Sequence, residues 1–219
     1  MDNPKQIVAR GFNSITQNYL KLVESMGTTV REKYLRVLIE RLPAGAQILE
    51  LGCGAGVPMT QRLASHFKVI GVDISKEQLV LATRNVPEAS FILADMTRLN
   101  FTNVAFDAVV AFYSITHVPR NEHFHLLTNI YRMLSPNGLL VATMGAGDSP
   151  DTVEPDWLGA PMFFSHFDGN TNVVLISEVG FEIASAIDER EWEYDRPVCF
   201  RWIVARKPDC TLVNCASNY

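Results

Sequence analysis

The sequence predicts an α/β protein built on a doubly wound, mostly parallel seven-stranded sheet that ends in an antiparallel hairpin. Short apolar runs alternate with segments of helical periodicity between about residues 46 and 145, as in βαβ units. Several of these runs are almost continuously apolar, which is typical of strands covered on both faces. With 219 residues, of which 47% are hydrophobic, the chain suits one domain with a large core.

The N-terminal residues 1–42 are predicted to form a helical cap. In REKYLRVLIERL, residues 31–42, apolar side chains recur at helical spacing, and Pro43 and Gly45 end the helix. The alternating part follows, with Ser75 predicted as an N-cap. Its strands are predicted at 46–51, 68–73, 90–95, 106–113 and 139–145, and its helices at 57–67, 75–85 and 121–135.

The amino-acid composition of the sequence changes after residue 145. Residues 145–170 are rich in Gly, Pro, Asp and aromatic side chains and are predicted to be a loop. A helix is predicted at 171–179, and two strands at 181–191 and 198–207 form a hairpin on the sheet edge. The single domain is therefore predicted to span residues 1–207, followed by a tail, 208–219, whose role is open.

Composition excludes several functional classes. The formal net charge is −5 and Lys and Arg do not cluster, which argues against binding nucleic acid. No signal-peptide core and no apolar stretch of about 18 residues is present, so we expect a cytoplasmic protein without membrane association. Cys53, Cys199, Cys210 and Cys215 lack a metal-binding spacing. We expect free thiols, with a Cys210–Cys215 bridge as the minor alternative.

A glycine-rich turn follows the first strand in ILELGCGAGVP, residues 48–58. It lacks the Gly-Lys-Ser/Thr of a P-loop, and the third glycine of a dinucleotide-binding turn is displaced by one position, to Gly56. Glu50 lies two residues before the first glycine, where a bound pyrophosphate would meet its carboxylate. S-adenosylmethionine (SAM) carries a sulfonium, an ammonium and no phosphate. The turn therefore favours SAM over NAD.

Two more acids end predicted strands. Asp73 lies about 20 residues after the turn, where a carboxylate can accept both ribose hydroxyls. Asp95 can accept the adenine amino group, and Met96 beside it can pack on the ring. Asp107 begins the fourth strand, at the opposite edge of the sheet, and is predicted to be structural.

In this order, the motifs resemble those of the class I SAM-dependent methyltransferases, from about residue 45 to 145. The stretches are ILELGCGAG, the acid in VIGVD, LADM and FDAVVAFYSITHVP. YSITHVPR and DWLGAPMFFSHFD also resemble a subgroup of small stand-alone methyltransferases. The resemblance implies SAM as cofactor, S-adenosylhomocysteine as product and no metal. By this resemblance the cofactor-binding residues are Glu50, Gly52, Cys53, Gly54, Asp73, Ile74, Asp95, Met96, Phe112 and Tyr113.

His117 is the candidate general base because it follows the fourth strand, at the ligand edge of the sheet. A base is needed only if the methyl acceptor carries a proton at neutral pH. The alternative is a histidine that hydrogen-bonds the loop or stacks on SAM. His123 and His125 are two residues apart on a helix, so they face different ways and do not share a metal.

The acceptor is expected between the N-terminal helices and the segment 145–170. Aromatic side chains this dense in a loop predict a lid over a small apolar or aromatic molecule. The alternative is that they plug the open edge of the sheet. Trp202, which alternates with Phe200 and Val204, is predicted to be core. The candidate substrate residues are Tyr19, Trp157, Met162, Phe163, Phe164 and His166.

The sequence therefore predicts methyl transfer from SAM to an O, N or S atom of a small molecule. One rival is a SAM-binding protein without transfer, either a partner subunit or a protein using SAM for other chemistry. A second rival is an NAD-dependent oxidoreductase, which the displaced glycine and Glu50 disfavour. The Asp/Asn-Pro-Pro-aromatic signature of DNA-amine methylation is absent. The acceptor and the oligomeric state are not indicated.

Overall fold

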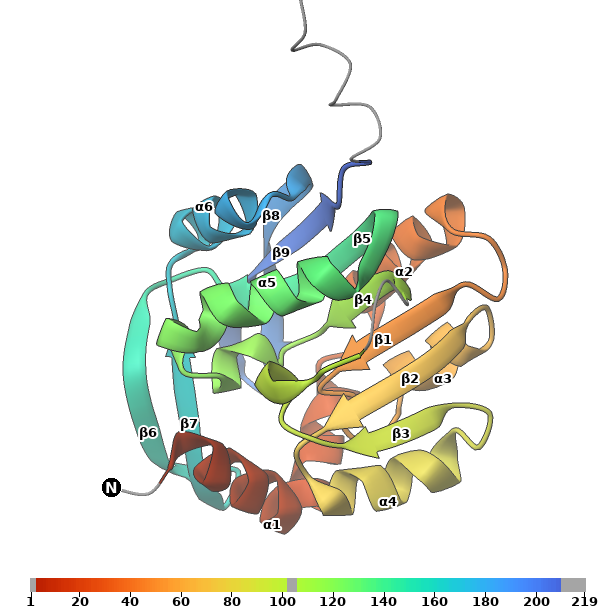
Figure 1. The fold of residues 1–219 in the computed structure, drawn as a ribbon. Coiled ribbons are helices and arrows are strands. Elements are labelled where there is room, and N and C mark those ends of the chain that lie inside the picture. The colour runs from red at the N-terminus through yellow and green to blue at the C-terminus, as the bar shows by residue number, and fades with distance from the viewer. Residues whose placement is uncertain (1–2, 102–105, 210–219) are drawn as a thin grey trace, which may run out of the picture.

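The computed structural model describes residues 3–101 and 106–209 (Figure 1). The strands are β1 (Gln47–Leu51), β2 (Lys68–Asp73), β3 (Ser90–Leu93), β4 (Phe106–Ala111), β5 (Leu134–Gly145), β6 (Ser149–Trp157), β7 (Ala160–His166), β8 (Glu182–Glu193) and β9 (Arg196–Arg206). The helices are α1 (Pro4–Ser25), α2 (Thr29–Arg41), α3 (Met59–Ala64), α4 (Lys76–Asn85), α5 (His123–Met133) and α6 (Gly169–Val179). Short 3₁₀ turns are η1 (Met96–Arg98), η2 (Ile115–His117) and η3 (Arg120–Glu122).

The main sheet has seven strands in the order β3-β2-β1-β4-β5-β9-β8. The pairs among β1 to β5 are parallel, and β9 pairs antiparallel with both β5 and β8. This confirms the predicted fold class, including the C-terminal hairpin. Because β9 enters between β5 and β8, the strand β8 forms one edge of the sheet.

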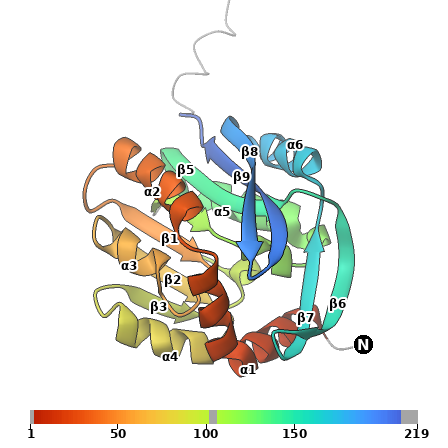
Figure 2. The same ribbon diagram turned by 180° about the vertical axis from the view of Figure 1, so that it is seen from behind.

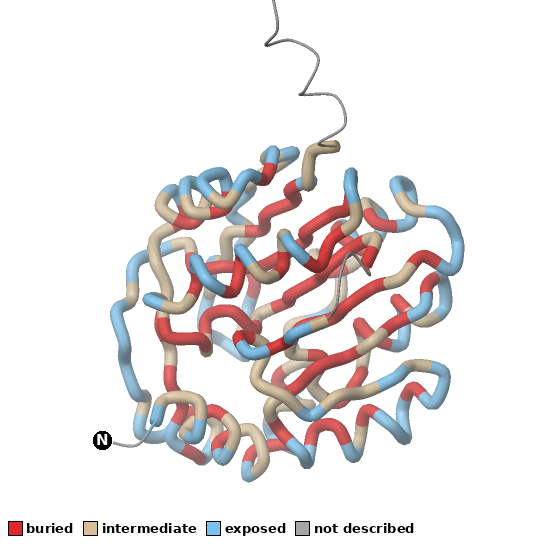
Figure 3. The backbone as a smooth tube through the Cα atoms, in the orientation of Figure 1, coloured by how far each residue is buried: buried red, intermediate tan, exposed pale blue. Residues whose placement is uncertain are grey.

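Helices cover both faces of this sheet (Figures 1 and 2). One core cluster joins β1, β4 and β5 to α5 and α6 through side chains such as Leu126, Ile130 and Ile176. The other joins the opposite face to α2 and α3 through side chains such as Leu38 and Leu63. The central strands are buried along most of their length (Figure 3). Cover on both faces explains why these strands are continuously apolar.

Local signals in the sequence mark several element ends. The Ser75 side chain accepts a hydrogen bond from the Gln78 backbone, which confirms the predicted N-cap of α4. Gly180 ends α6 with a φ of 111°, a conformation that glycine adopts without strain. Trp202 is fully buried and stacks on Tyr34 with ring centroids 4.2 Å apart, so its prediction as core is confirmed.

The prediction that residues 145–170 are a loop is wrong. Most of them form a two-stranded antiparallel sheet of β6 and β7. The two strands are joined at Leu158 and Gly159, whose φ angles of 57° and 103° are both positive, as in a tight hairpin turn. Leucine at the first of these positions gives no turn signal, and the prolines of β6 argued against a strand.

The helix α1 and the β6–β7 hairpin pack against each other. Their shared cluster includes Val8, Ile15, Met162 and Phe163. Both elements lie beyond the carboxyl ends of β1, β2 and β3 (Figure 1). In a doubly wound fold, this is the edge of the sheet where ligands bind.

Candidate functional site

The glycine turn after β1 is packed too closely for side chains. Gly52 has a φ of 77°, and a Cβ atom added to it would lie 2.3 Å from Cβ of Ser114. Its backbone N–H donates to the Val72 carbonyl at 2.7 Å. These contacts hold the turn against β2 and against the segment after β4. Because its glycines have no side chains, a ligand can approach the backbone of the turn closely.

Asp73 at the end of β2 is held by backbone N–H groups. Its two carboxylate oxygens accept hydrogen bonds from the backbones of Gly54 and Ser75, both at 2.8 Å. Burial raises the pKa of this carboxyl, and the backbone hydrogen bonds partly offset the rise. Asp73 thus fixes the glycine turn and also lines the cavity beside it, together with Ile74.

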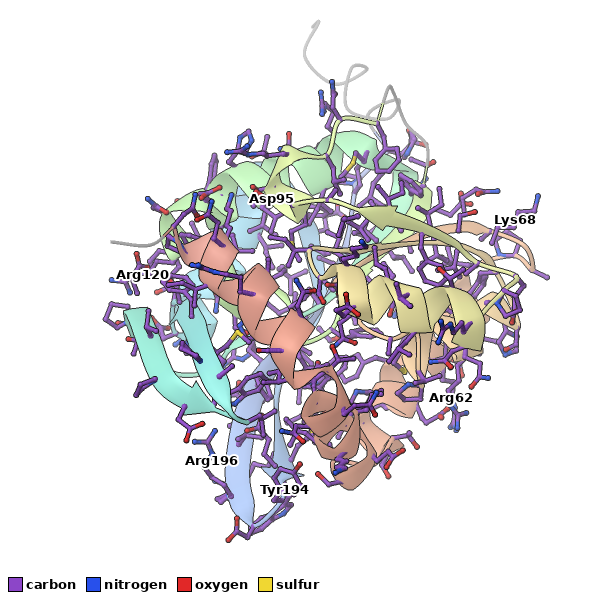
Figure 4. The ribbon with its side chains drawn as sticks, turned by 90° about the horizontal axis from the view of Figure 1, so that it is seen from below. Arg62, Lys68, Asp95, Arg120, Tyr194 and Arg196 are labelled. Atoms are coloured by element: carbon purple, nitrogen blue, oxygen red, sulfur yellow. The ribbon has the colours of Figure 1, made fainter. Side chains whose placement is uncertain are left out.

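Asp95 after β3 forms an ion pair that links it to α1. Lys5 Nζ lies 2.8 Å from Asp95 Oδ2, and Asp95, which is labelled in Figure 4, also accepts a hydrogen bond from the Thr97 backbone. Burial raises the pKa of the Asp95 carboxyl, but the hydrogen bonds from Lys5 and Thr97 outweigh burial and hold it below its usual value. No sequence pattern marked Lys5 as a site residue, because α1 reaches Asp95 only in the folded protein.

Glu50 is almost fully buried in β1. It accepts a hydrogen bond from the Thr60 hydroxyl at 2.6 Å and has 3% exposure. Desolvation raises the pKa of Glu50 to about 8, because the Thr60 hydrogen bond offsets only part of the rise and the negative charge of Asp73 adds to it. Asp107 instead accepts from the Gln47 backbone at 2.8 Å, at the other edge of the sheet, so its structural role is confirmed.

Three neighbouring cavities open at this edge. We call them the strand-end cavity, the glycine-loop cavity and the hairpin cavity. The strand-end cavity is lined by residues after β1 to β4 and by α1, namely Lys5, Val8, Phe12, Tyr19, Gly52, Gly54, Val72, Asp73, Ile74, Gln78, Ala94, Asp95, Met96, Phe112, Tyr113, Ser114, His117 and Val118. It therefore brings together Asp73, Asp95 and Met96 as the sequence predicts.

The glycine-loop cavity adjoins the strand-end cavity at the glycine turn. It is lined by Tyr19, Leu20, Val23, Arg31, Glu50, Gly52, Cys53, Gly54, Ala55, Val57, Pro58, Met59, Phe112 and Tyr113. Glu50 and Cys53 face this cavity, whereas Gly52 and Gly54 line both. Arg31, at the start of α2, was not singled out in the sequence.

Gln78 was also missed by sequence reasoning. It lies on α4, has 1% exposure, and lines the strand-end cavity. Neither polar atom of its amide has a hydrogen-bond partner in the described structure. Buried polar groups are almost always hydrogen-bonded, so this amide is suited to a ligand group. In the sequence alone, a glutamine near the start of a predicted helix does not indicate that its amide will line a cavity.

Tyr113 and Tyr19 line all three cavities. Tyr113 follows β4 with a φ of 57°, unusual for a residue other than glycine, and its hydroxyl donates to Glu191 at 2.6 Å. Burial raises the pKa of the Tyr113 hydroxyl above its usual value, and burial raises that of Tyr19 to about 12. Both phenols therefore stay neutral at physiological pH.

The hairpin cavity has a volume of about 260 Å³. It is lined by α1, α2, the segment after β4, the β6–β7 hairpin and the tip of the β8–β9 hairpin. Its residues are Tyr19, Leu22, Met26, Arg31, Tyr113, Thr116, His117, Ser149, Glu154, Trp157, Phe164, His166, Glu193, Arg196, Val198, Cys199 and Phe200. Figure 4 shows Tyr194 and Arg196 at the outer tip of the β8–β9 hairpin.

The candidate substrate residues divide into two groups. Trp157, Phe164 and His166 line the hairpin cavity, as does Tyr19. Met162 and Phe163, with exposures of 0% and 2%, instead pack in the cluster between α1 and the β6–β7 hairpin.

His117 lines both the strand-end cavity and the hairpin cavity. Its Nδ1 lies 2.9 Å from the Phe163 carbonyl, so Nδ1 carries the proton and Nε2 keeps a free lone pair. Phe12 and Phe164 lie at ring-centroid distances of 5.1 Å and 4.8 Å. Burial lowers the pKa of His117 to about 4, so the ring is neutral at physiological pH.

The described residues contain no group of three or more His, Cys, Asp or Glu side chains that could hold a metal ion. In the same part of the chain, no helix has the length and apolarity to cross a membrane. Cys53 and Cys199 are free thiols. Cys210 and Cys215 lie outside the described residues.

Residues 48–138 match a family of sequences described as a methyltransferase domain. A trans-aconitate 2-methyltransferase from Variovorax paradoxus is 34% identical over 106 residues, which cover 47% of this chain and 40% of that protein. A demethylmenaquinone methyltransferase from Renibacterium salmoninarum is 29% identical over 143 residues, which cover 64% of this chain and 60% of that protein. The chain thus matches about half the length of these relatives.

The fold is shared with solved structures. Magnesium protoporphyrin IX methyltransferase from Synechocystis with bound S-adenosylhomocysteine superposes with a TM-score of 0.72. The alignment covers 94% of this chain and 100% of that one at 16% sequence identity. At this identity the likeness concerns the fold.

Proposed function

We propose that this chain, whose residues 48–138 match a methyltransferase domain, is a class I SAM-dependent methyltransferase that transfers a methyl group from SAM to an O, N or S atom of a small apolar or aromatic molecule. S-adenosylhomocysteine is then the second product. The alternative is a protein that binds SAM without transferring its methyl group, as a partner subunit or for other chemistry. The position of His117 between two cavities is the observation that favours transfer.

The residues of the strand-end cavity fit the adenosine part of SAM. Asp73 suits the ribose hydroxyls, Asp95 suits the adenine amino group, and the bare backbone at Gly52 permits close approach. The unpartnered Gln78 amide in the same wall can hydrogen-bond a polar ligand. Bound SAM supplies an activated methyl group on a sulfonium.

His117 is proposed to act on the methyl acceptor. Its neutral Nε2 can accept a hydrogen bond from an O–H or N–H group in the hairpin cavity and so hold the acceptor atom toward the strand-end cavity. A pKa of about 4 makes His117 a weak base. A weak base suffices here, because the proton on a hydroxyl oxygen becomes strongly acidic as that oxygen is methylated.

Aromatic walls favour an apolar or aromatic acceptor. Tyr19, Trp157 and Phe164 form one continuous group, with Trp157 to Phe164 at a ring-centroid distance of 5.5 Å. Such walls bind flat apolar molecules, and a few polar groups among them set the orientation. The volume of about 260 Å³ lies just below the roughly 300–1,000 Å³ that is usual for small-molecule sites. We therefore propose that the β6–β7 hairpin forms the lid that was expected as a loop.

The cofactor is tested by thermal unfolding with SAM, S-adenosylhomocysteine and NADH in parallel. A ligand at about 100 times its dissociation constant stabilises a protein by about 2.7 kcal/mol, or roughly 5–10 °C for a chain of this size. We expect this shift with both sulfur ligands and none with NADH. A shift with NADH alone would overturn the proposal.

Transfer itself is tested by measuring S-adenosylhomocysteine formed with a panel of phenols, aromatic amines and thiols. We expect product with at least one phenol, and none when the acceptor is omitted. Tight SAM binding without product from any acceptor class would favour the alternative of a SAM-binding protein without transfer.

A further inference from the structure

Glu191 on β8 is a buried carboxyl group that the proposed function does not use. Its exposure is 6%, and it is not among the residues that line the three cavities described above. Burial raises the pKa of this carboxyl, and the Tyr113 hydroxyl and the charge of Arg31 offset part of the rise. Burying a carboxyl group costs free energy unless its hydrogen bonds offset the cost, so its partners indicate its role.

The hydrogen-bond partner of Glu191 is Tyr113, which lines all three cavities. We call the position of the Tyr113 ring the junction. The Tyr113 hydroxyl lies 2.8 Å and 2.6 Å from the two carboxyl oxygens of Glu191. A hydroxyl that donates to both oxygens of one carboxyl group is fixed in orientation as well as in position. Glu191 therefore holds the outer end of a ring that borders both the proposed cofactor site and the proposed acceptor site.

The other contacts of Tyr113 hold its backbone and the face and edge of its ring. The backbone has a φ of 57°, and its N–H donates to the Thr143 hydroxyl. Arg31 Cζ lies 4.5 Å from the ring centroid, and the centroids of Phe200 and Trp202 lie at 4.9 Å and 5.6 Å. A left-handed φ is costly for a residue other than glycine and persists only where the surroundings maintain it. The structure therefore determines the place of this ring closely.

Glu191 also connects the junction to the C-terminal hairpin. It pairs with Val198 across the β8–β9 ladder, and both Val198 and Phe200 line the hairpin cavity. One hydrogen-bonded group thus joins the strand pair beside the hairpin cavity to the ring at the junction. The family match ends at residue 138, so it does not include Glu191.

We propose that Glu191 is a positioning residue for methyl transfer and that it acts through Tyr113. In the transfer, the acceptor atom forms a bond to the methyl carbon while the carbon–sulfur bond breaks and its electron pair stays on sulfur. The proton of a hydroxyl acceptor passes to His117, as proposed above. By holding the Tyr113 hydroxyl, Glu191 fixes the wall that keeps the acceptor atom in line with the methyl group. A misplacement of about 1 Å can lower the rate of such a reaction about 100-fold.

The inference rests on the proposed function, because it takes SAM to bind in the strand-end cavity and the acceptor in the hairpin cavity. The test is a double-mutant cycle in steady-state kinetics with an acceptor that gives product in the panel above. Wild type, Tyr113→Phe, Glu191→Leu and the double variant are compared. Glu182→Leu, at the exposed start of β8, is the matched control and should behave as wild type.

We expect kcat to fall about 10–100-fold in each single variant, because the ring is no longer held at its hydroxyl end. The double variant should lose no more than the single variants, since both changes remove the same hydrogen bond. The affinity for SAM, measured by calorimetry, and the KM of the acceptor should change less than about threefold. Glu191→Gln keeps an oxygen that can accept from Tyr113, so its kcat should stay within about fivefold of wild type.

Thermal unfolding without ligand verifies that each variant folds. Tyr113→Phe removes a single oxygen atom and carries the same prediction if Glu191→Leu does not fold. Wild-type kcat in the folded single variants would overturn the inference. Losses that multiply in the double variant, or a raised acceptor KM at unchanged kcat, would also overturn it. Wild type that forms no S-adenosylhomocysteine with any acceptor would overturn the proposed function and this inference together, and that failure is seen before any variant is compared.

Discussion

His117 owes its properties to the residues around it. The Phe163 carbonyl fixes which nitrogen carries the proton, and the aromatic neighbours lower the pKa to about 4. An exposed histidine would be partly charged near neutral pH. In this setting the imidazole is a permanent hydrogen-bond acceptor between the two cavities.

Replacing His117 should reduce turnover and leave cofactor binding intact. For His117→Gln we expect kcat with a hydroxyl acceptor to fall about 100-fold or more, the usual effect of losing a positioned base. SAM affinity should change less than about threefold, because the proposed contact of His117 is with the acceptor. Steady-state kinetics and calorimetry measure the two quantities.

The matched control is His125→Gln, an exposed histidine on α5. It should behave as wild type in both assays. If His117→Gln instead loses SAM binding with kcat unchanged at saturation, the histidine serves the cofactor, as in the alternative interpretation of the sequence.

At the scale of elements, α1 carries much of the site. It contributes Tyr19 to all three cavities and Lys5 to the ion pair with Asp95. The strand-end cavity holds only about 60 Å³ with α1 in this position. Small-molecule sites are usually about 300 Å³ or larger, so we expect α1 to shift when SAM binds.

Removing the ion pair should loosen the start of α1. In Lys5→Met, we expect amide hydrogen exchange of residues 5–12 to accelerate severalfold, with the exchange of β1 and β4 unchanged. The reason is that Lys5 contacts Asp95, Thr97 and Glu122, which anchor α1 to the segments after β3 and β4.

Lys21→Met on the same helix is the control, since Lys21 is exposed. Its exchange should match that of wild type. Equal exchange in Lys5→Met and wild type would show that the apolar cluster with the β6–β7 hairpin holds α1 by itself.

The order of the elements was predictable because its signals are local. Apolar runs, the Ser75 cap and Gly180 each act within a few residues of the chain. The β6–β7 hairpin was missed because its Leu158-Gly159 turn lacks the usual residues and its core contacts are with α1, far away in sequence. Non-local packing of this kind leaves little trace in a short window.

The site residues at strand ends were predictable, whereas those on helices were not. Asp73 and Asp95 were identified because strand ends of a parallel sheet meet at one edge, and both line the strand-end cavity. Lys5 and Gln78 were missed because their helices reach the cavity only through tertiary packing.

At the scale of the whole molecule, two buried groups oppose each other in the pH dependence of stability. The pKa of Glu50 is raised to about 8, so its protonated form stabilises the fold below about pH 4.5 and this contribution is lost as pH rises through 8. The pKa of His117 is lowered to about 4, so its contribution is present above about pH 6.5 and is lost as pH falls through 4.

Between pH 6.5 and 8 the Glu50 contribution therefore changes while that of His117 does not. We expect the ligand-free Glu50→Gln variant to gain stability over wild type as pH rises from 6.5 to 8, because glutamine never ionises and can still accept from Thr60. Urea unfolding at several pH values measures the difference. Glu40→Gln, at an exposed position of α2, is the control. A difference independent of pH would contradict the raised pKa of Glu50.

The strand β8 has a further consequence, for behaviour in concentrated solution. It spans Glu182–Glu193 at the edge of the sheet, and an edge strand of this length can recruit a strand from another molecule. Asp188, Glu189 and Arg190 follow one another along it. Two copies approaching edge to edge would have to desolvate these charges. The sheet thereby resists aggregation along the same strand whose hairpin helps to line the hairpin cavity.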